Sequence, residues 1–121
     1  MPFELDQAAL DVIRGLQRPG QPDVLAMIVN LFCESAPRLI ATMGNAVIQG
    51  DYPAAATAAH TLKSSAAHLG LHELYELCTA IENHGGGATT EAIKRIIDRI
   101  QALYPDAEQA LRAVVARGSE R

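Results

Sequence analysis

Hydrophobic residues recur every three or four positions along most of this chain. Such spacing places apolar side chains on one face of an α-helix. It predicts helices at residues 6–16, 23–49, 52–69, 71–84 and 89–117. One long apolar stripe lies in 23–49 and comprises Leu25, Ile28, Val29, Phe32, Leu39, Ile40, Met43 and Val47. No segment alternates apolar and polar residues with the period of a β-strand.

Short breaker sequences separate the predicted helices. Residues 18–22 follow the first helix, Gly50 and Gly70 end the second and third, and a glycine run at 85–87 ends the fourth. The first helix is short, and its predicted inner face consists of Ala9, Val12, Ile13 and Leu16. Each connection is therefore only a few residues long.

Two prolines, Pro37 and Pro105, fall inside predicted helices, where we expect them to kink or interrupt the helix. Short loops between long amphipathic helices place consecutive helices side by side in opposite directions. The pattern therefore predicts an all-α fold: an antiparallel up-down four-helix bundle with a short additional N-terminal helix that caps one end. The length is that of a single domain, residues 1–121.

The composition suits packed helices, because 49% of the 121 residues are hydrophobic but only 4% are aromatic. The net charge is −4 and basic residues are scattered, which argues against a nucleic-acid-binding protein. No apolar run approaches about 18 residues, and the N-terminus does not resemble a signal peptide. We therefore expect a cytoplasmic chain without membrane insertion. Cys33 and Cys78 occupy apolar positions and are expected to be buried free thiols.

His60 is the residue with the most unusual surroundings. On a helix over residues 52–69, Leu62 and Leu69 fall on the side opposite His60. The residues within roughly 60° of it are small or cationic; they are Ala56, Thr57, Lys63, Ser64 and Ala67. An isolated exposed histidine usually has no role, but this one points outward, lacks bulky neighbours and has a lysine one turn away.

This arrangement has the parts that phosphoryl transfer needs. A neutral imidazole is a competent phosphoryl acceptor near neutral pH, because its unperturbed pKa is about 6.5. Lys63 could neutralise charge on the arriving phosphoryl oxygens. The small residues around His60 would let the active site of another protein approach the ring. The pattern predicts His60 as a phosphoacceptor and its surroundings as a docking face.

The stretch Ala58-Ala-His-Thr-Leu-Lys-Ser-Ser-Ala-Ala-His-Leu-Gly70 resembles the signature of histidine-containing phosphotransfer (HPt) domains, His-x-Leu-Lys-Gly-Ser followed by small residues and a glycine. Phe32 with Ala36-Pro37 and Leu39 is similar to the second helix of that family, and 74–82 with Cys78 to the fourth. The resemblance implies that His60 is phosphorylated, that Lys63 is its basic neighbour and that Gly70 is the family glycine. Ser64 stands where many members have glycine.

The resemblance also implies partners: receiver domains of response regulators or hybrid sensor kinases, which would supply Mg²⁺ and most of the catalytic groups. The chain itself would need no cofactor and would be a monomer. It could be free-standing or a module of a larger sensor kinase. A bundle that binds a receiver or kinase without being phosphorylated stays an alternative, although such a chain would be expected to have lost His60 or Lys63.

Other site classes are less well supported. Dimerisation domains of sensor kinases place an acidic residue directly after the histidine, where this chain has Thr61, and the glycine run at 85–87 lacks the Gly-Lys-Ser/Thr of a phosphate loop. We therefore expect no autokinase activity. His68 and His72 are four residues apart and could bind one metal ion if they lay on one continuous helix. Gly70 ends the helix between them, so no metal site is predicted. We expect Ser65 to pack at the edge of the bundle and to have no catalytic role. We expect His84 to lie near a helix C-terminus and to interact with the helix dipole.

Overall fold

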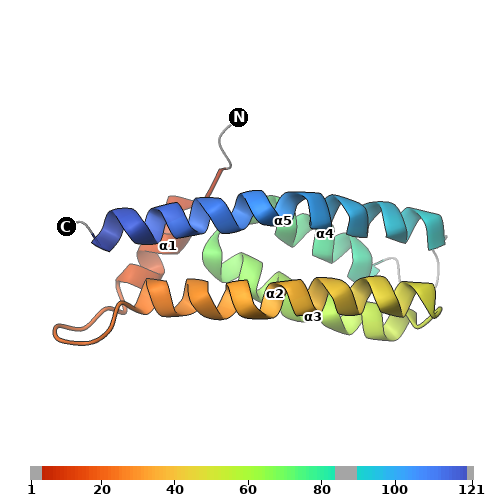
Figure 1. Cartoon of the computed structure of the whole chain (residues 1–121), viewed down its shortest axis with the longest axis horizontal. Coiled ribbons are helices and arrows are strands. Elements are labelled where there is room, and N and C mark those ends of the chain that lie inside the picture. The colour runs from red at the N-terminus through yellow and green to blue at the C-terminus, as the bar shows by residue number, and fades with distance from the viewer. Residues whose placement is uncertain (1–3, 84–89, 120–121) are drawn as a thin grey trace.

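The computed structural model describes residues 4–83 and 90–119, and all regular structure within them is helical (Figure 1). Its elements are α1 (Gln7–Arg14), α2 (Val24–Ile48), α3 (Tyr52–Leu69), α4 (His72–Asn83) and α5 (Thr90–Ser119). The predicted all-α fold is confirmed. The helix boundaries lie close to those expected from the apolar spacing. Three aspartates explain where helices begin, because Asp6, Asp23 and Asp51 each accept a backbone N–H of the first turn.

Helices α2 to α5 lie side by side with their axes roughly aligned, and the chain direction reverses from each helix to the next (Figure 1). Contacts join α2 to α3, α3 to α4, α4 to α5 and α5 back to α2, so the four helices surround a shared core. Helix α1 lies at the end where α2 begins and α5 ends, and it contacts α2 and α3. This arrangement leaves one side of α3 and α4 facing outward.

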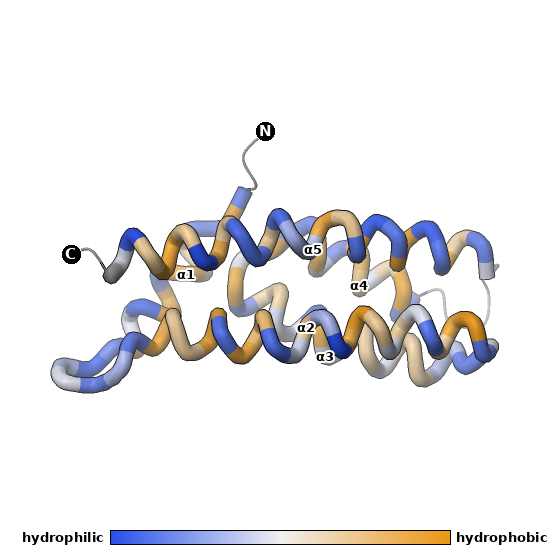
Figure 2. Tube along the Cα trace, viewed as in Figure 1, coloured by the Kyte–Doolittle hydropathy of each residue, from blue (hydrophilic) through white to orange (hydrophobic). Residues whose placement is uncertain are grey.

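The core consists of apolar side chains from all five helices, and no described polar or charged residue is buried. Figure 2 shows hydrophobic and hydrophilic positions alternating along the helices, as their amphipathic spacing requires. Cys33 and Cys78 are free and buried, as expected. Burial raises the pKa of the Cys78 thiol to about 12, so it stays protonated.

The predicted inner face of the first helix is partly wrong. Ile13 is buried together with Leu10, but the side chains of Val12 and Leu16 are 71% and 64% exposed. Helix α1 has only 8 residues, and Leu16 lies beyond its end. Helix α1 contacts only one end of the bundle, so it buries a narrow stripe. That stripe consists of Leu10 and Ile13, which are one turn apart.

Helix α2 is long and apolar enough to cross a membrane by length and composition alone. That test is weak for a single helix, because the core helix of a bundle passes it as well. In this structure α2 contributes Leu25, Val29, Phe32 and Met43 to the core. Packing against α3 and α5 therefore accounts for part of its hydropathy, while Met27, Leu31 and Ile48 on the same helix remain exposed.

Neither internal proline ends its helix, since α2 continues through Pro37 and α5 through Pro105. Of the two outcomes expected at Pro105, a bend or a brief break, the break does not occur, because α5 is continuous. Pro37 lacks the N–H that would bond the carbonyl of Cys33 four residues earlier. The hydroxyl of Tyr104 on α5 lies 3.3 Å from that carbonyl oxygen and 2.9 Å from Oε2 of Glu108, so two acceptors share its single hydrogen. A side chain of the neighbouring helix thus stands in, in part, for the missing backbone donor.

Gly70 fixes the tight connection between α3 and α4. It has φ of 72°, the left-handed conformation that favours glycine, and the N–H of Leu71 returns to the carbonyl of Ala66 at 2.9 Å. A Cβ on Gly70 would also lie 2.8 Å from the Cβ of Asp6. Asp6 packs this closely because its N–H donates to the Gly70 carbonyl, while its carboxylate pairs with His72 at 2.9 Å. The turn at Gly70 brings α4 back alongside α3, and Asp6 packs against that turn.

Candidate functional site

Helix α3 holds His60 on its outward face. Its inner face is buried and consists of Ala55, Ala58, Ala59, Leu62, Ala66 and Leu69. The His60 side chain is 65% exposed. The alanines let α3 pack closely on its neighbours, and the imidazole stands on the opposite, outward face of the helix.

The residues expected around His60 lie where the helical spacing places them. Thr57, Ser64 and Ala67 are exposed, and Ala56 and Lys63 are half-buried. The Ser64 hydroxyl donates to the backbone carbonyl of His60 at 3.2 Å, and that of Thr57 donates to Pro53 at 3.0 Å. Because both hydroxyls bond their own helix, the surface beside the imidazole is low and only weakly polar.

The sequence suggested that the charge of Lys63 would be available to an incoming anion. In the structure Lys63 is already paired with a carboxylate. Its ammonium lies 2.8 Å from Oε1 of Glu82 on α4, and 5.9 Å from the centre of the Tyr75 ring. The hydrogen bond to Glu82 is the main reason why the pKa of Lys63 is raised above its ordinary value. In the resting protein the lysine charge is therefore already neutralised by a carboxylate.

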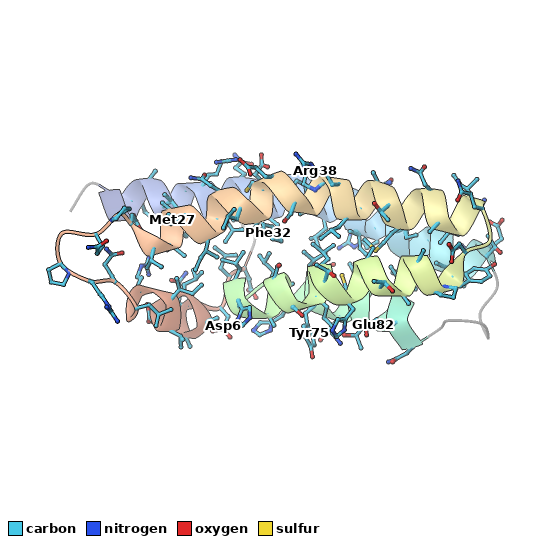
Figure 3. All side chains as sticks on the ribbon, turned by 90° about the horizontal axis from the view of Figure 1, so that it is seen from below. Asp6, Met27, Phe32, Arg38, Tyr75 and Glu82 are labelled. Carbon is cyan, nitrogen blue, oxygen red and sulfur yellow. The ribbon has the colours of Figure 1, made fainter. Side chains whose placement is uncertain are left out.

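Glu82 is the site residue that sequence reasoning missed. Its Oε1 contacts Lys63 and its Oε2 lies 3.2 Å from Nδ1 of His60, so one carboxylate joins both residues. Figure 3 shows Glu82 and Tyr75 along one edge of the bundle, whereas Arg38 lies at the opposite edge. The hydrogen bond from Lys63, and then that from His60, lower the pKa of Glu82 despite partial burial.

A signal for Glu82 does exist in the sequence. His60 lies eleven residues before Leu71, and Glu82 lies eleven residues after it. If two antiparallel helices turn at Gly70 and Leu71, residues equally far from the turn stand opposite each other. Periodicity marks 82 only as the neighbour of the buried Ile81, so the pairing across the turn is needed to find it.

The hydrogen bond decides the tautomer of the His60 ring. An ionised carboxylate can only accept hydrogen bonds, so Nδ1 must carry the hydrogen that it donates to Glu82. The lone pair of the neutral ring is then on Nε2. The arrangement presents a nucleophilic nitrogen on an exposed side chain, with a cation and a carboxylate beside it.

The other sequence candidates lie apart from this cluster. Ser65 is half-buried, and with His68 it lines a groove of about 220 Å³ between α2 and α3 that also includes Leu31. His72 pairs with Asp6 instead of sharing a metal with His68. Among residues 4–83 and 90–119, no group of three or more His, Cys, Asp or Glu side chains could hold a metal ion. His84 and the glycine run at 85–87 lie outside the described residues.

Comparison with known proteins identifies the family. No curated protein and no solved structure matches the chain. A family model for the Hpt domain matches residues 27–113, which include α3, α4 and the whole His60 cluster. Hpt domains are phosphocarriers that take part in histidine phosphotransfer in phosphorelays and interact with receiver domains. The match covers more than half of the sequence, and the chain therefore belongs to the Hpt domain family.

Proposed function

We propose that His60 accepts a phosphoryl group from the aspartyl phosphate of one receiver domain and passes it to the aspartate of another. The observation that carries this proposal is the His60 ring itself: it is exposed, and its Nδ1 is occupied by Glu82. Nε2 is therefore the nitrogen available to an incoming phosphoryl group. No other described histidine lies in such a cluster of cation and carboxylate.

The transfer is a displacement at phosphorus. Nε2 of His60 attacks, the bond from phosphorus to the aspartyl oxygen breaks, and a bond between phosphorus and Nε2 forms. In the second transfer the aspartate of the next receiver attacks and the ring leaves. Lys63 would turn from Glu82 toward the phosphoryl oxygens and offset their charge. Mg²⁺ would be held by the receiver, so the chain needs no cofactor and has no autokinase role.

The docking face in this proposal centres on Ala56, Thr57, Ser64 and Ala67. Small side chains keep the surface beside His60 low, which lets the acidic pocket of a receiver reach the ring. Ser64 is short enough to serve where many family members have glycine. The chain would work as a cytoplasmic monomer that meets one receiver at a time.

Labelling tests the phosphoacceptor. Wild type incubated with a receiver carrying radioactive aspartyl phosphate should gain acid-labile label, and His60→Gln should gain none. The free energy of unfolding should change by less than about 0.5 kcal/mol, because the ring is exposed. His68→Gln is the matched control and should label normally. Label that persists in His60→Gln would sink the assignment, and a wild type that binds a receiver without being labelled would be the adaptor alternative.

A second substitution tests the docking face separately from the chemistry. Ala67→Arg adds a long side chain to an exposed position beside His60 on α3. Transfer from a receiver should fall at least tenfold, roughly the effect of losing 1.4 kcal/mol of interface energy. Phosphorylation by the small donor phosphoramidate should be unaffected, because it needs no docking. Unchanged receiver transfer in this variant would show that the face lies elsewhere.

A further inference from the structure

We propose that the groove between α2 and α5 is a contact surface for a second copy of this chain, which docks there in the opposite direction and leaves both His60 side chains free. The groove has a volume of about 230 Å³. Its lining residues are Gly44, Val47 and Ile48 on α2, and Lys94, Ile97, Asp98 and Gln101 on α5. The inference goes beyond the proposed function, because it does not require His60 to be phosphorylated.

The groove lies on the side of the bundle opposite the His60 cluster. Each of the helices α2 to α5 contacts two of the other three, so the α2–α5 seam faces away from the α3–α4 seam that holds Lys63 and Glu82. In Figure 1, α2 and α5 lie in front of α3 and α4. A molecule bound in this groove would therefore not cover the imidazole.

An exposed apolar side chain and an open recess lie next to each other in the groove. Ile48 is 74% exposed, more than any other large apolar side chain that the structure describes. Gly44, one turn earlier on α2, has no side chain, and an added Cβ there would meet nothing within 4 Å. Val47 and Ile97 beside them are buried. Ile48 of another molecule could therefore enter the space above Gly44 and leave contact with water.

Two opposite charges lie one turn apart on the other wall of the groove. Lys94 and Asp98 are both exposed on α5. Within residues 4–83 and 90–119, no ion pair includes either of them. The order along the helix, lysine before aspartate, is the less favourable one for a pair within a helix. Both charges are therefore available to another molecule.

The register of the two helices places these features at matching levels. Asn30 on α2 accepts a hydrogen bond from Arg112 on α5 at 3.4 Å. Because α2 and α5 run in opposite directions, equal steps forward along α2 and back along α5 stay level. Fourteen residues from that contact lie Gly44 and Asp98, and eighteen residues from it lie Ile48 and Lys94.

A two-fold axis then makes the surface complementary to itself. In a symmetric dimer each contact occurs twice, because residue i of one copy meets residue j of the other and the reverse. We place the axis across the seam, at right angles to the helices and midway between the two levels. Lys94 then faces Asp98 of the second copy, and Ile48 faces Gly44 of the second copy. Each charge meets its opposite, and each exposed isoleucine meets a recess.

The pairing is expected to be weak. Helix α2 ends at Ile48 and α5 begins at Thr90, so the axis lies near one end of the bundle and only the ends of the two molecules overlap. Interfaces below about 1,200 Å² are typical of transient complexes, and exposed ion pairs add little. We expect a dissociation constant between about 10 μM and 1 mM. At lower concentrations the chain is the monomer of the proposed function.

Sedimentation equilibrium of the whole chain across about 10 μM to 1 mM tests the pairing. The average mass should rise from that of one chain, 12.9 kDa, toward twice that value. Lys94→Asp should weaken association at least about tenfold, because two attractive contacts become two repulsive ones. Asp98→Lys should do the same. Arg95→Asp is the matched control, since it makes the same charge change at an adjacent exposed position of α5 and should associate like wild type.

A mixture of the two charge variants tests the symmetry. Lys94→Asp and Asp98→Lys, mixed in equal amounts, regain an opposite charge at both contacts and should associate about as well as wild type. Arg95→Asp mixed with Asp98→Lys controls for attraction through net charge alone and should not regain association.

A second pair of variants tests the apolar contact. Ile48→Ser should weaken association, because the recess above Gly44 loses its occupant. Leu31→Ser removes an exposed apolar side chain of the same helix from the groove between α2 and α3, and it should have no effect.

The outcomes decide the proposal in either direction. A mass that stays at 12.9 kDa at every concentration would overturn it and leave the groove to a helix of a different protein. Association that is unchanged in Lys94→Asp or in Ile48→Ser would show that the copies meet elsewhere. Transfer from a receiver should proceed equally in wild type and Lys94→Asp, since the groove faces away from His60. A slower transfer in that variant would contradict a dimer that leaves His60 free.

Discussion

Of the polar side-chain contacts that link neighbouring helices in this bundle, two differ clearly in what they do. Between α2 and α5, the hydroxyl of Tyr104 reaches the carbonyl of Cys33, which has lost its helical donor to Pro37. Between α3 and α4, Glu82 bonds Lys63 and His60, and every atom involved belongs to a side chain. The Tyr104 contact offers a donor to a helix carbonyl that lacks one. The Glu82 contact brings His60 and Lys63 together.

The environments of the two contacts reflect this difference. Tyr104 packs against Phe32 with ring centres 6.0 Å apart and also lies 2.9 Å from Glu108. Burial is the main reason why its pKa is raised, so the hydroxyl remains a donor. His60 is exposed. The contact that serves the backbone is partly buried, whereas the contact at His60 leaves the reactive side chain exposed to solvent.

The largest effect on folding is expected at the turn that sets the α3–α4 contact. Gly70→Ala should lower the free energy of unfolding by roughly 2–4 kcal/mol, because the left-handed conformation costs about 1–2 kcal/mol and the new Cβ overlaps Asp6. Urea unfolding monitored by circular dichroism measures this. Gly50→Ala is the control: its φ is 75°, but nothing lies within 4 Å of the added Cβ. Equal costs at the two glycines would mean that the Asp6 contact is unimportant.

A smaller effect is expected at the α2–α5 contact. Tyr104→Phe should lower the free energy of unfolding by about 1 kcal/mol, because the Cys33 carbonyl loses its donor. In a Pro37→Ala background the restored backbone N–H can bond that carbonyl, so the same substitution should cost less. A double-mutant cycle in urea compares the two costs. If they are equal, the hydroxyl serves Glu108 and not the helix.

The smallest stability effect is expected at the α3–α4 contact, and it depends on pH. The pKa of Glu82 is lowered in the folded protein, chiefly by Lys63, so its contribution is present above the ordinary value of 4.5 and is lost as pH falls through the lowered pKa. The difference in unfolding free energy between wild type and Glu82→Gln should be below that for Tyr104→Phe at pH 7 and vanish in acid. A difference that does not shrink as pH falls below 4.5 would contradict the ion pair as its source.

Local spacing predicted most of what a single helix decides. The apolar period set the helices and placed His60 opposite Leu62 and Leu69, because the residues on one face of a helix are fixed by 3.6 residues per turn. Gly70 marked the end of α3 for an equally local reason, its freedom to adopt positive φ. The small residues beside His60 followed from the same wheel.

Only the tertiary structure decided which side chains of one helix contact those of another. The partner of His60 and Lys63, the donor that replaces the N–H of Pro37, and the exposure of Val12 all depend on which residues meet across an interface. Periodicity gives the face of each helix, but the pairing of two faces depends on packing and on the tight turn at Gly70. The sequence by itself therefore determined an outward histidine on a helical bundle. Packing then supplied the carboxylate that selects which of its nitrogens is free.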